Sequence, residues 1–343
     1  MPTAIITGIT GQDGAYLAKF LLGQGYKVYG TFRRVSQPNF GRLERLGVLA
    51  DVELIPFDLL DQSSMIEALR RVQPDEIFNL AAQSFVGASF EQPVATGEIT
   101  GLGLTRLLDS VRLVCPEAKF YQASSSEMFG KVQAVPQDES TPFYPQSPYA
   151  AAKLYAHWVT VNYRQAYKLF ACSGILFNHE SPLRGLEFVT RKITYSVARI
   201  YHGLQEKVSL GNLDARRDWG YAEDFVEGMW KMLQQPRPDT YVLATGENHS
   251  VREFAERAFA VMDMDWQQYV DVDESLLRPT DVQTLLGNPK KAVETLGWDP
   301  QKTPFDELVG MMVESDVELV GREKAASLGY ERQKLREYPH FKE

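Results

Sequence analysis

The sequence TAIITGITGQDG at residues 3–14 joins a short apolar, β-branched run to the start of an amphipathic segment. Glycines in a strand-to-helix turn permit a tight bend, close approach of a pyrophosphate and close packing of helix on strand. The helix N-terminus adds unpaired N–H groups and the positive end of its dipole. Turn glycines have other uses, but this position, at the start of an alternating pattern, favours a dinucleotide site. Its expected residues are Gly8, Thr10, Gly11, Gln12, Asp13 and Gly14.

The first half of the chain alternates short apolar runs with amphipathic segments. Runs at residues 3–7, 27–32, 52–57, 76–80, 119–123 and 169–176 predict strands. Segments 12–23, 63–72, 96–114 and 147–167 predict the helices between them. Because buried strands alternate with helices, the predicted fold class is α/β, a Rossmann-type doubly wound parallel sheet.

The pattern loosens beyond the sixth strand. Helices are expected at 189–201, 222–233, 251–261 and 304–320, with a late strand at 241–244. Residues 1–178 would form the Rossmann domain, to which about 215–245 return. Residues of about 179–214 and 246–322 would form a smaller, partly interleaved α/β substrate lobe. Residues 323–343 would form a charged C-terminal tail.

Bulk composition narrows the class of protein. The 343 residues are 44% apolar and 24% charged, which is ordinary for a globular protein with a large core. A net charge of −9 argues against a broad nucleic-acid surface, which needs clustered Lys and Arg. Cys115 and Cys172 both have apolar neighbours, as is typical of reduced thiols in the cytoplasm. No apolar stretch of about twenty residues occurs, so neither a membrane span nor a signal peptide is expected. No metal site is expected either.

Arg33 and Arg34 follow the second expected strand, where an NAD enzyme carries an acidic residue for the ribose hydroxyls. No Asp or Glu lies between residues 14 and 43. Guanidinium groups suit a 2′-phosphate, so NADP is the predicted cofactor, with an exposed basic turn as the alternative. Asp58 and Leu59, after the third strand, are placed to contact the adenine, although Asp58 could instead cap the next helix.

A second group of polar residues surrounds the end of the fifth strand and the helix after it. Tyr149 and Lys153 are one helical turn apart, and an ammonium near a phenol favours the phenolate, a base for an alcohol proton. Ser125 and Glu127 follow a strand at the edge where open α/β sheets bind ligands. Together they could oxidise a carbinol and deprotonate the neighbouring carbon, which indicates elimination of water. The alternatives are a packed ring with a solvated lysine and a Ser-rich cap with a surface carboxylate.

Longer blocks carry a resemblance to a known family. Besides the glycine turn and the four residues above, these blocks are NLAAQS at 79–84, TPFYPQSPY at 141–149, LFNHESPLRG at 176–185, FVTRK at 188–192 and RDWG at 217–220. From about residue 3 to residue 320 the chain resembles the extended short-chain dehydrogenase/reductase superfamily. Within that superfamily it is most similar to the GDP-mannose 4,6-dehydratase family.

The resemblance implies a lyase that turns GDP-mannose into GDP-4-keto-6-deoxymannose and water, a step toward deoxysugars such as GDP-fucose. Tyr149 would remove the C4 hydroxyl proton while hydride passes from C4 to a tightly bound NADP. Glu127 would abstract the C5 proton, which the 4-ketone acidifies, as the C6 hydroxyl leaves; the hydride would then return to C6. Ser125 stands where the family usually has threonine, and its hydroxyl can still hydrogen-bond the C4 oxygen.

The resemblance also implies binding roles. The residues implied for the cofactor are Leu80, Ala81, Ala82, Gln83, Ser84, Tyr149, Lys153, His179 and Arg184. Those implied for the GDP-sugar are Ser84, Ser125, Glu127, Asn178, Val189, Lys192, Gly211, Arg217 and Arg278. A homodimer or homotetramer is expected, since family members are often dimers or tetramers. Residues 33–45 resemble a loop used between subunits near the cofactor, unless their arginines are simply solvated.

Three alternatives stay open on the sequence. The substrate could be GDP-D-glycero-D-manno-heptose, which similar dehydratases handle. An epimerase or ketosugar reductase of the same superfamily would keep Tyr149 and Lys153 but would not need Glu127. A non-catalytic NADP-binding protein belongs to another class, and the intact set of four residues argues against it. The expected partner is a nucleotide sugar, with neither nucleic acid nor membrane.

Overall fold

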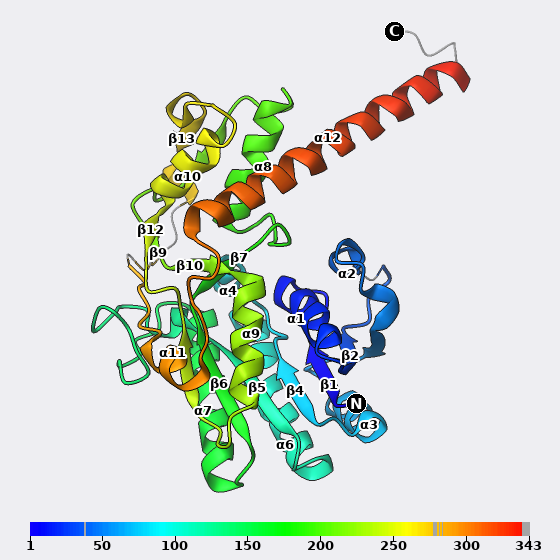
Figure 1. Ribbon diagram of the computed structural model, residues 1–343, viewed down its shortest axis with the longest axis vertical. Helices are drawn as coiled ribbons and strands as arrows, with labels where there is room; N and C mark the ends of the chain where they lie inside the picture. Colours follow the sequence, from blue (N-terminus) through cyan, green and yellow to red (C-terminus); the bar gives the residue numbers. More distant parts are fainter. Residues whose placement is uncertain (38, 277–279, 281, 283, 338–343) are drawn as a thin grey trace.

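The described part of the chain is built around a seven-stranded parallel sheet (Figure 1). The structure is a computed structural model that describes residues 1–343 except 38, 277–279, 281, 283 and 338–343, without the side chains of 328–337. The strands are β1 (Thr3–Thr7), β2 (Lys27–Phe32), β3 (Glu53–Pro56), β4 (Glu76–Asn79), β5 (Lys119–Ser125), β6 (Ala171–Leu176) and β11 (Thr240–Leu243). Their order is β11-β6-β5-β4-β1-β2-β3. The strand order reverses between β1 and β4, which confirms the doubly wound Rossmann-type fold.

Helices cover both faces of this sheet. On one face α1 (Gln12–Gly23) packs against α9 (Ala222–Leu233), and on the other α3 (Gln62–Val72) and α7 (Pro148–Ala166) pack against α6 (Gly103–Val114). Apolar side chains form a separate core on each face. Ile6 and Phe225 belong to one core, whereas Ile5 and Phe120 belong to the other. Adjacent Ile5 and Ile6 point to opposite faces, as successive strand residues must.

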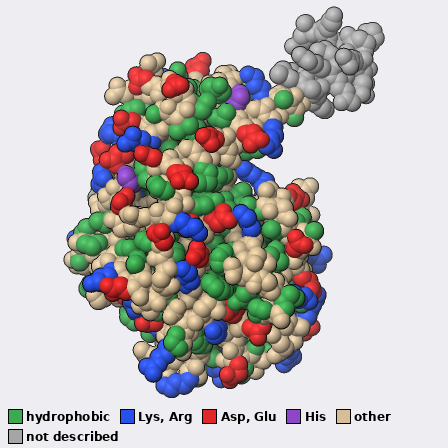
Figure 2. Space-filling model, in the orientation of Figure 1, with side chains coloured by type: hydrophobic (Ala, Val, Ile, Leu, Met, Phe, Trp, Pro, Cys, Tyr) green, Lys and Arg blue, Asp and Glu red, His purple; other side chains and the backbone are tan. Residues whose placement is uncertain are grey.

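A smaller lobe lies beyond the carboxyl ends of the strands (Figure 1). It contains α8 (Val189–Tyr201), α10 (Val251–Ala260) and α12 (Phe305–Glu337), with β8 (Val208–Leu210) paired to β13 (Val270–Val272). Ile193, Phe254 and Met312 belong to its own apolar core. Two short strand pairs lie at its base: β7 (Asn178–Glu180) with β10 (Trp219–Tyr221), and β9 (Arg216–Arg217) with β12 (His249–Ser250). The surface is hollowed between this lobe and α2 (Gly41–Arg45) (Figure 2).

Further short helices are α4 (Val86–Glu91), α5 (Pro93–Thr96) and α11 (Lys290–Leu296). The helix expected at 96–114 is interrupted, because α5 passes into a π-helical turn, η2 (Gly97–Leu102), before α6 begins. This turn brings Thr100 to the loop after β4, where its Oγ1 accepts a hydrogen bond from the Gln83 nitrogen at 3.2 Å. π-helical turns are frequent at functional sites. The spacing of apolar residues in the sequence does not reveal the extra residue that such a turn contains, so the interruption was not expected.

Helix α12 continues to Glu337, well beyond the end expected at residue 320. Its later part is rich in Glu, Lys, Arg and Ala, which are strong helix formers. Contacts with α8 and the residue after it also hold this part: Tyr195 Oη donates to Glu323 at 2.9 Å, and Lys324 Nζ donates to the His202 carbonyl at 2.7 Å. The beginning of the expected tail is therefore a docked helix.

Two further expectations concern the thiols and the membrane. Cys115 and Cys172 are free and buried, and burial raises the pKa of each thiol to about 11. In the part of the chain that the structure describes, no helix combines the length and the apolar character that a membrane span requires.

Candidate active site at the carboxyl edge of the sheet

A cavity lies where β4, β5 and β6 end. Parallel strands place their carboxyl ends at one edge of a sheet, and the register aligns Ser125 of β5 with Leu176 of β6. The expected site residues that line the cavity are Asp13, Leu80, Ala82, Ser84, Ser125, Glu127, Tyr149, Lys153, Asn178, His179 and Arg184. All four residues expected to be catalytic thus face one space.

The glycine turn forms a narrow cradle beside this cavity. Gly8 has a φ of +71°, and a Cβ on it would lie 3.0 Å from the Ala81 nitrogen. A Cβ on Gly14 would lie 2.4 Å from the Gly8 oxygen. Thr7 Oγ1 accepts hydrogen bonds from the Leu80 and Ala81 nitrogens, both at 3.1 Å, and so ties the turn to the loop after β4. Side chains are excluded from this cradle, which is the form that a pyrophosphate site takes.

Ser125 and Glu127 lie on the turn that ends β5. Ser125 Oγ accepts a hydrogen bond from the Glu127 nitrogen at 3.2 Å and so caps the single helical turn Ser126–Met128. Ser125 is buried and Glu127 is half-buried, and both line the cavity. A hydroxyl and a carboxylate two residues apart are therefore available to the same ligand.

Tyr149 and Lys153 project from the first turns of α7. Ser147 starts the helix, since its Oγ accepts a hydrogen bond from the Ala150 nitrogen at 3.0 Å. Lys153 Nζ lies 5.8 Å from the centre of the Tyr149 ring and donates to the Ala123 carbonyl at 2.8 Å. The lysine is thereby anchored to β5, next to the turn that carries Ser125.

Burial controls the protonation of this pair. It raises the pKa of Tyr149 to about 12, although the Ser125 hydroxyl and the charge of Arg184 oppose the rise. It lowers the pKa of Lys153 to about 8. The expectation that the pKa of the Tyr149 phenol lies below its usual value is wrong for this structure, because desolvation of the ring outweighs the charges around it. Lys153 instead donates a hydrogen bond to the Ala123 carbonyl.

An ion pair joins the glycine turn to the segment after β6. Asp13 Oδ2 lies 2.8 Å from His179 Nε2, and the Phe177 carbonyl lies 2.7 Å from His179 Nδ1. Both ring nitrogens face acceptors, so both carry protons and the imidazole is cationic. Burial opposes both charges, yet their attraction and hydrogen bond lower the pKa of Asp13 to about 2 and raise that of His179. The two residues were each expected at the cofactor, but their pairing across 166 positions was not predicted.

The residues expected at the adenosine end lie farther along the same edge. Arg33 and Arg34 follow β2, are exposed, and make no hydrogen bond or ion pair with another described residue. Asp58 does not cap α3, because Asp61 does so. Asp58 instead accepts a hydrogen bond within the turn after β3, and Leu59 beside it is buried.

The residues implied for the GDP-sugar fall into two groups. Asn178 lines the cavity, and its Oδ1 is buried without a hydrogen-bond partner among the described residues. A buried acceptor without a partner is costly, which favours a polar ligand here. The second group, Val189, Lys192, Gly211 and Arg217, lies at the smaller lobe and does not line the cavity. Arg278 lies outside the described residues.

Several lining residues were not predicted. They are Val86, Ala123, Ser124, Ser126, Leu176, Phe177 and Phe188. Phe188 carries the Arg184 guanidinium 3.7 Å above its ring centre, and Ser124 Oγ lies 3.1 Å from His157 Nδ1 behind β5. Phe177 and Phe188 belong to the sequence blocks that carry the family resemblance. Their neighbours in the sequence do not distinguish a residue that lines a cavity from an ordinary core residue.

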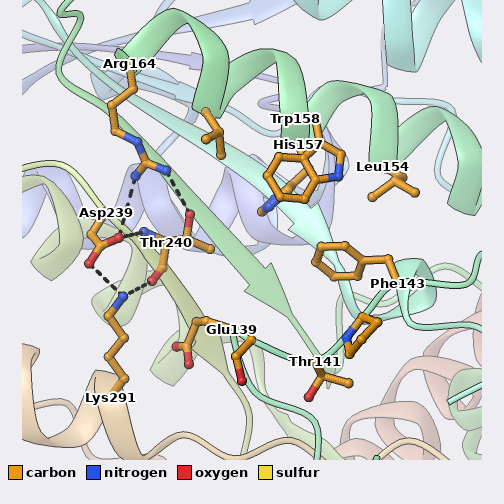
Figure 3. A pocket seen from close by; sticks show the side chains of 13 residues that line it. Glu139, Thr141, Phe143, Leu154, His157, Trp158, Arg164, Asp239, Thr240 and Lys291 are labelled. Atoms are coloured by element: carbon orange, nitrogen blue, oxygen red, sulfur yellow. Dashed lines mark hydrogen bonds and ion pairs between the residues drawn. The ribbon is translucent and has the colours of Figure 1, made fainter. Parts of the chain in front are cut away.

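A larger cavity lies beside the middle of α7. Its volume is about 580 Å³, against about 150 Å³ for the cavity at the sheet edge. Arg164, Asp239 and Lys291 form an ionic wall, and Phe143 and Trp158 stand opposite (Figure 3). None of the four residues expected to be catalytic lines it, so chemistry and not size identifies the candidate active site.

Similarity to characterised proteins extends over nearly the whole chain. The family described as GDP-mannose 4,6 dehydratase matches residues 5–312. The chain is 53% identical over 331 residues to GDP-mannose 4,6 dehydratase 2 of Arabidopsis thaliana, covering 94% of this chain and 88% of the relative. It is 51% identical over 342 residues to the GDP-mannose 4,6 dehydratase of Homo sapiens, covering 92% of each.

Solved structures share the fold at lower identity. The dTDP-glucose 4,6-dehydratase DesIV from Streptomyces venezuelae, with NAD and TYD bound, has a TM-score of 0.82 and 22% identity, covering 93% of this chain and 98% of that one. RMD from Pseudomonas aeruginosa, complexed with NADPH, has a TM-score of 0.77 and 21% identity, covering 93% and 99%. The structural likeness supports the architecture, and the family match covers the site. This chain therefore belongs to the GDP-mannose 4,6-dehydratase family.

Proposed function

We propose that this protein is a hydro-lyase that converts GDP-mannose into GDP-4-keto-6-deoxymannose and water. The observation that carries the proposal is the arrangement of Ser125, Glu127, Tyr149 and Lys153 around one cavity beside the glycine cradle. Oxidation of an alcohol needs only the tyrosine and its neighbours, whereas elimination also needs a base for the next carbon. The family supports GDP-mannose over GDP-heptose as the sugar.

The cofactor proposed is NADP, held throughout each turnover. The glycine cradle and the first turn of α1 would hold its pyrophosphate. Arg33 and Arg34 are exposed and available, so their guanidinium groups would bind a 2′-phosphate, while Asp58 and Leu59 would face the adenine. Related structures bound to NADPH and to NAD support a nicotinamide cofactor in this fold. When bound, the cofactor supplies the hydride acceptor for C4 and the hydride donor for C6.

Tyr149 would accept the proton of the C4 hydroxyl. A phenol with a pKa of about 12 holds its proton at neutral pH, so the base needs additional positive charge nearby. Lys153, 5.8 Å from the ring, and Arg184 on the cavity wall already supply positive charge in the protein alone, and the oxidised nicotinamide of a bound cofactor would add to it. Ser125 Oγ would hydrogen-bond the C4 oxygen and hold it toward the phenol.

Glu127 would act on the carbon next to that oxygen. Once C4 is a ketone, the C5 proton is acidic, and an oxygen held by Ser125 brings C5 toward the carboxylate two residues away. Glu127 removes the C5 proton and returns a proton to the C6 hydroxyl as its bond to C6 breaks. As hydride returns to C6, C5 takes up a proton from solvent, which balances the proton that Tyr149 accepted and releases. The sugar therefore loses one water in total, and both side chains end in the state in which they began.

The proposal also assigns the GDP-binding residues, the oligomeric state and the cellular compartment. Asn178, the lobe residues Val189, Lys192, Gly211 and Arg217, and Arg278 would bind the GDP moiety. Residues 1–178 with about 215–245 would hold the cofactor, and residues of about 179–214 and 246–322 would hold the substrate. Tyr155 and Trp158 expose 44% and 55% of their area on α7, an apolar face that a homodimer or homotetramer would cover. Two buried thiols suit the reducing cytoplasm.

Parallel incubation with GDP-mannose and GDP-D-glycero-D-manno-heptose tests this function. Mass spectrometry should detect the loss of one water from GDP-mannose, with no net reduction of cofactor. Preferential loss of water from the heptose would show that GDP-heptose, and not GDP-mannose, is the substrate. Formation of an epimer or a reduced sugar without loss of water would show that the enzyme is an epimerase or a reductase. No change in either substrate would refute the proposal.

A further inference from the structure

Three consecutive main-chain carbonyls, at residues 182–184, accept hydrogen bonds from arginine side chains. Arg191 on α8 supplies two of these bonds, since its Nη1 donates to the Pro182 carbonyl at 2.6 Å and to the Arg184 carbonyl at 2.9 Å. Its other side faces Asp316 of α12, whose two oxygens both lie 2.8 Å from Arg191 Nε. Arg191 is 4% exposed and Asp316 is fully buried, so the lobe's interior fixes the direction of this guanidinium.

Two more arginines reach the same segment from α2, on the opposite side of the hollow. Arg42 Nε donates to the Leu183 carbonyl at 2.7 Å, and its Nη1 donates to the Thr10 carbonyl in the glycine turn at 3.0 Å. Arg45 Nη1 donates to the carbonyl at 182 at 3.3 Å, and its Nη2 donates to Ser315 Oγ at 3.0 Å. These two arginines of the basic 33–45 segment are therefore bound to the chain and are not simply solvated.

The geometry explains why arginine serves here. A guanidinium presents several donors in a rigid plane, so one side chain can join two carbonyls or a carbonyl and a carboxylate. Arg42 joins the glycine turn to residue 183, and Arg191 joins residues 182 and 184 to α12. Residues 182–184 thus connect α2, beside the large sheet, with α8 and α12 of the smaller lobe (Figure 1).

The segment so held leads directly into the candidate active site. Arg184 lines the cavity, its Nε lies 3.1 Å from Glu180 Oε2, and its guanidinium covers the Phe188 ring. The Arg184 charge is also one of the influences that oppose the high pKa of Tyr149. A loop left to itself would sample several positions, and the charge would move with it.

We propose that Arg42, Arg45 and Arg191, here named the arginine clamp, are positioning residues that hold segment 182–184 so that Arg184 faces the cavity during the reaction. The proposal rests on the dehydratase function proposed above. It adds residues that line no part of the cavity and act through the main chain of their neighbours.

Arg42 is the residue to change first, because Arg191 belongs to a buried ion pair whose loss risks unfolding. Arg42→Met removes the donors and keeps the apolar stem, and Arg42→Lys keeps the charge but cannot join two carbonyls in one plane. Arg237→Met, at an exposed arginine without a hydrogen bond or ion pair to another described residue, is the matched control. Arg45→Met provides a second test should Arg42→Met fail to fold.

Hydrogen exchange measured by mass spectrometry on the peptide covering residues 181–188 reports the clamp without any ligand. Exchange should be about tenfold faster in Arg42→Met, intermediate in Arg42→Lys and unchanged in Arg237→Met. Wild-type exchange in Arg42→Met and in Arg45→Met would overturn the proposal.

Kinetics on GDP-mannose then test the link to the reaction. In Arg42→Met, kcat should fall about tenfold or more, with a smaller change in KM, because a misplaced group costs rate more than binding. The pH at which kcat reaches half of its maximum should shift upward, because the Arg184 charge would lie less favourably for Tyr149, and a merely structural loss would not cause this shift. Arg42→Lys should recover part of kcat. Faster exchange with unchanged kcat would overturn the positioning role. A wild-type protein that does not dehydrate GDP-mannose would refute the proposed function, while the exchange data would still decide whether the clamp exists.

Discussion

The end of β5 and the segment 178–185 both line the candidate active site, but they are held in different ways. β5 lies between β4 and β6, and its backbone is paired on both sides as far as Gln122 and with β6 as far as Ser125, which pairs with Leu176. The segment 178–185 has one three-residue pairing, with β10, and a local turn at Ser181, and it is otherwise held by distant side chains such as Arg42 and Arg191. The main-chain pairing of a strand fixes the position of the side chains at its end. A loop held by side chains can shift when one of those side chains is replaced. Substitutions there should therefore change the alignment and affinity of the substrate and the pH dependence of the rate more than the chemical step itself.

The largest expected effect belongs to the strand side. Glu127→Gln keeps the size of the side chain and removes the only charged base on the turn after β5, so turnover should fall by at least about 10³-fold. NADP binding should be unchanged, because Glu127 takes no part in the glycine cradle. Loss of water from GDP-mannose, followed by mass spectrometry, measures the first effect, and cofactor retained after gel filtration measures the second. Turnover close to that of the wild type would refute the role given to Glu127.

The next effect concerns the lysine anchored to β5. Burial lowers the pKa of Lys153 to about 8, so its charge is lost as pH rises through that value. Loss of this positive charge, 5.8 Å from the ring, would make the Tyr149 phenolate still harder to form, so kcat/KM should decline above pH 8. Lys153→Arg cannot lose its charge and should show a shallower decline, at a rate about 10²-fold lower because the longer head group does not fit beside Ala123. Equal pH profiles for the two proteins would contradict this assignment.

The difference between the two regions also separates what could be predicted from the sequence. Every strand of the large sheet was expected within a few residues, because short apolar runs and glycine turns are local signals. Ser125, Glu127, Tyr149 and Lys153 could be predicted as site residues because they occupy strand ends and helix starts, where local chemistry and position agree. The cavity then brings them together as expected.

The contacts of the loop side have no such signal. Arg42 meets Leu183 across 141 positions, and Asp13 meets His179 across 166. A run of arginines at 33–45 has the same composition whether its members are solvated or hold a loop. The protonation of Tyr149 depends on how deeply the ring is buried, which neither spacing nor charge pattern contains. These features follow from the packing of the lobe on the sheet, so only the structure reveals them.

A moderate effect is expected on the exposed part of the cofactor site. Replacing Arg33 and Arg34 together by alanine removes two guanidinium groups proposed for the 2′-phosphate, and affinity for NADP should fall about tenfold to a hundredfold. Affinity for NAD, which has no such phosphate, should change by less than about twofold. Isothermal titration with both cofactors measures the two effects. Equal losses for NADP and NAD would show that these arginines do not select the phosphate.

A smaller effect is expected from the ion pair between Asp13 and His179. The pKa of Asp13 is lowered to about 2, so its contribution to stability is present above 3.8 and is lost as pH falls toward 2. The pKa of His179 is raised, so its contribution is complete below 6.5 and is lost as pH rises through the folded value. Between pH 6 and pH 9 the wild type should therefore lose about 1 kcal/mol more free energy of unfolding than His179→Gln. Urea unfolding at both pH values measures the difference, and identical losses would contradict the charged pair.

The smallest expected effect lies at Ser125, where the resemblance of the sequence leads us to expect threonine. Ser125→Thr keeps the hydroxyl, and a β-branched side chain has fewer rotamers, so the oxygen should be held more firmly toward Tyr149. Ser125 is 9% exposed, and a methyl group added there either fills space or crowds its neighbours. Since the residue ends β5 beside a cavity, we expect the methyl group to fit and kcat to rise by no more than about threefold. Ser125→Ala, which removes the hydroxyl that caps the turn carrying Glu127, should instead lower kcat at least tenfold. A tenfold loss of kcat in Ser125→Thr would mean that the residues around the end of β5 leave no room for the methyl group of threonine. Serine would then be required at this position by the packing of this chain.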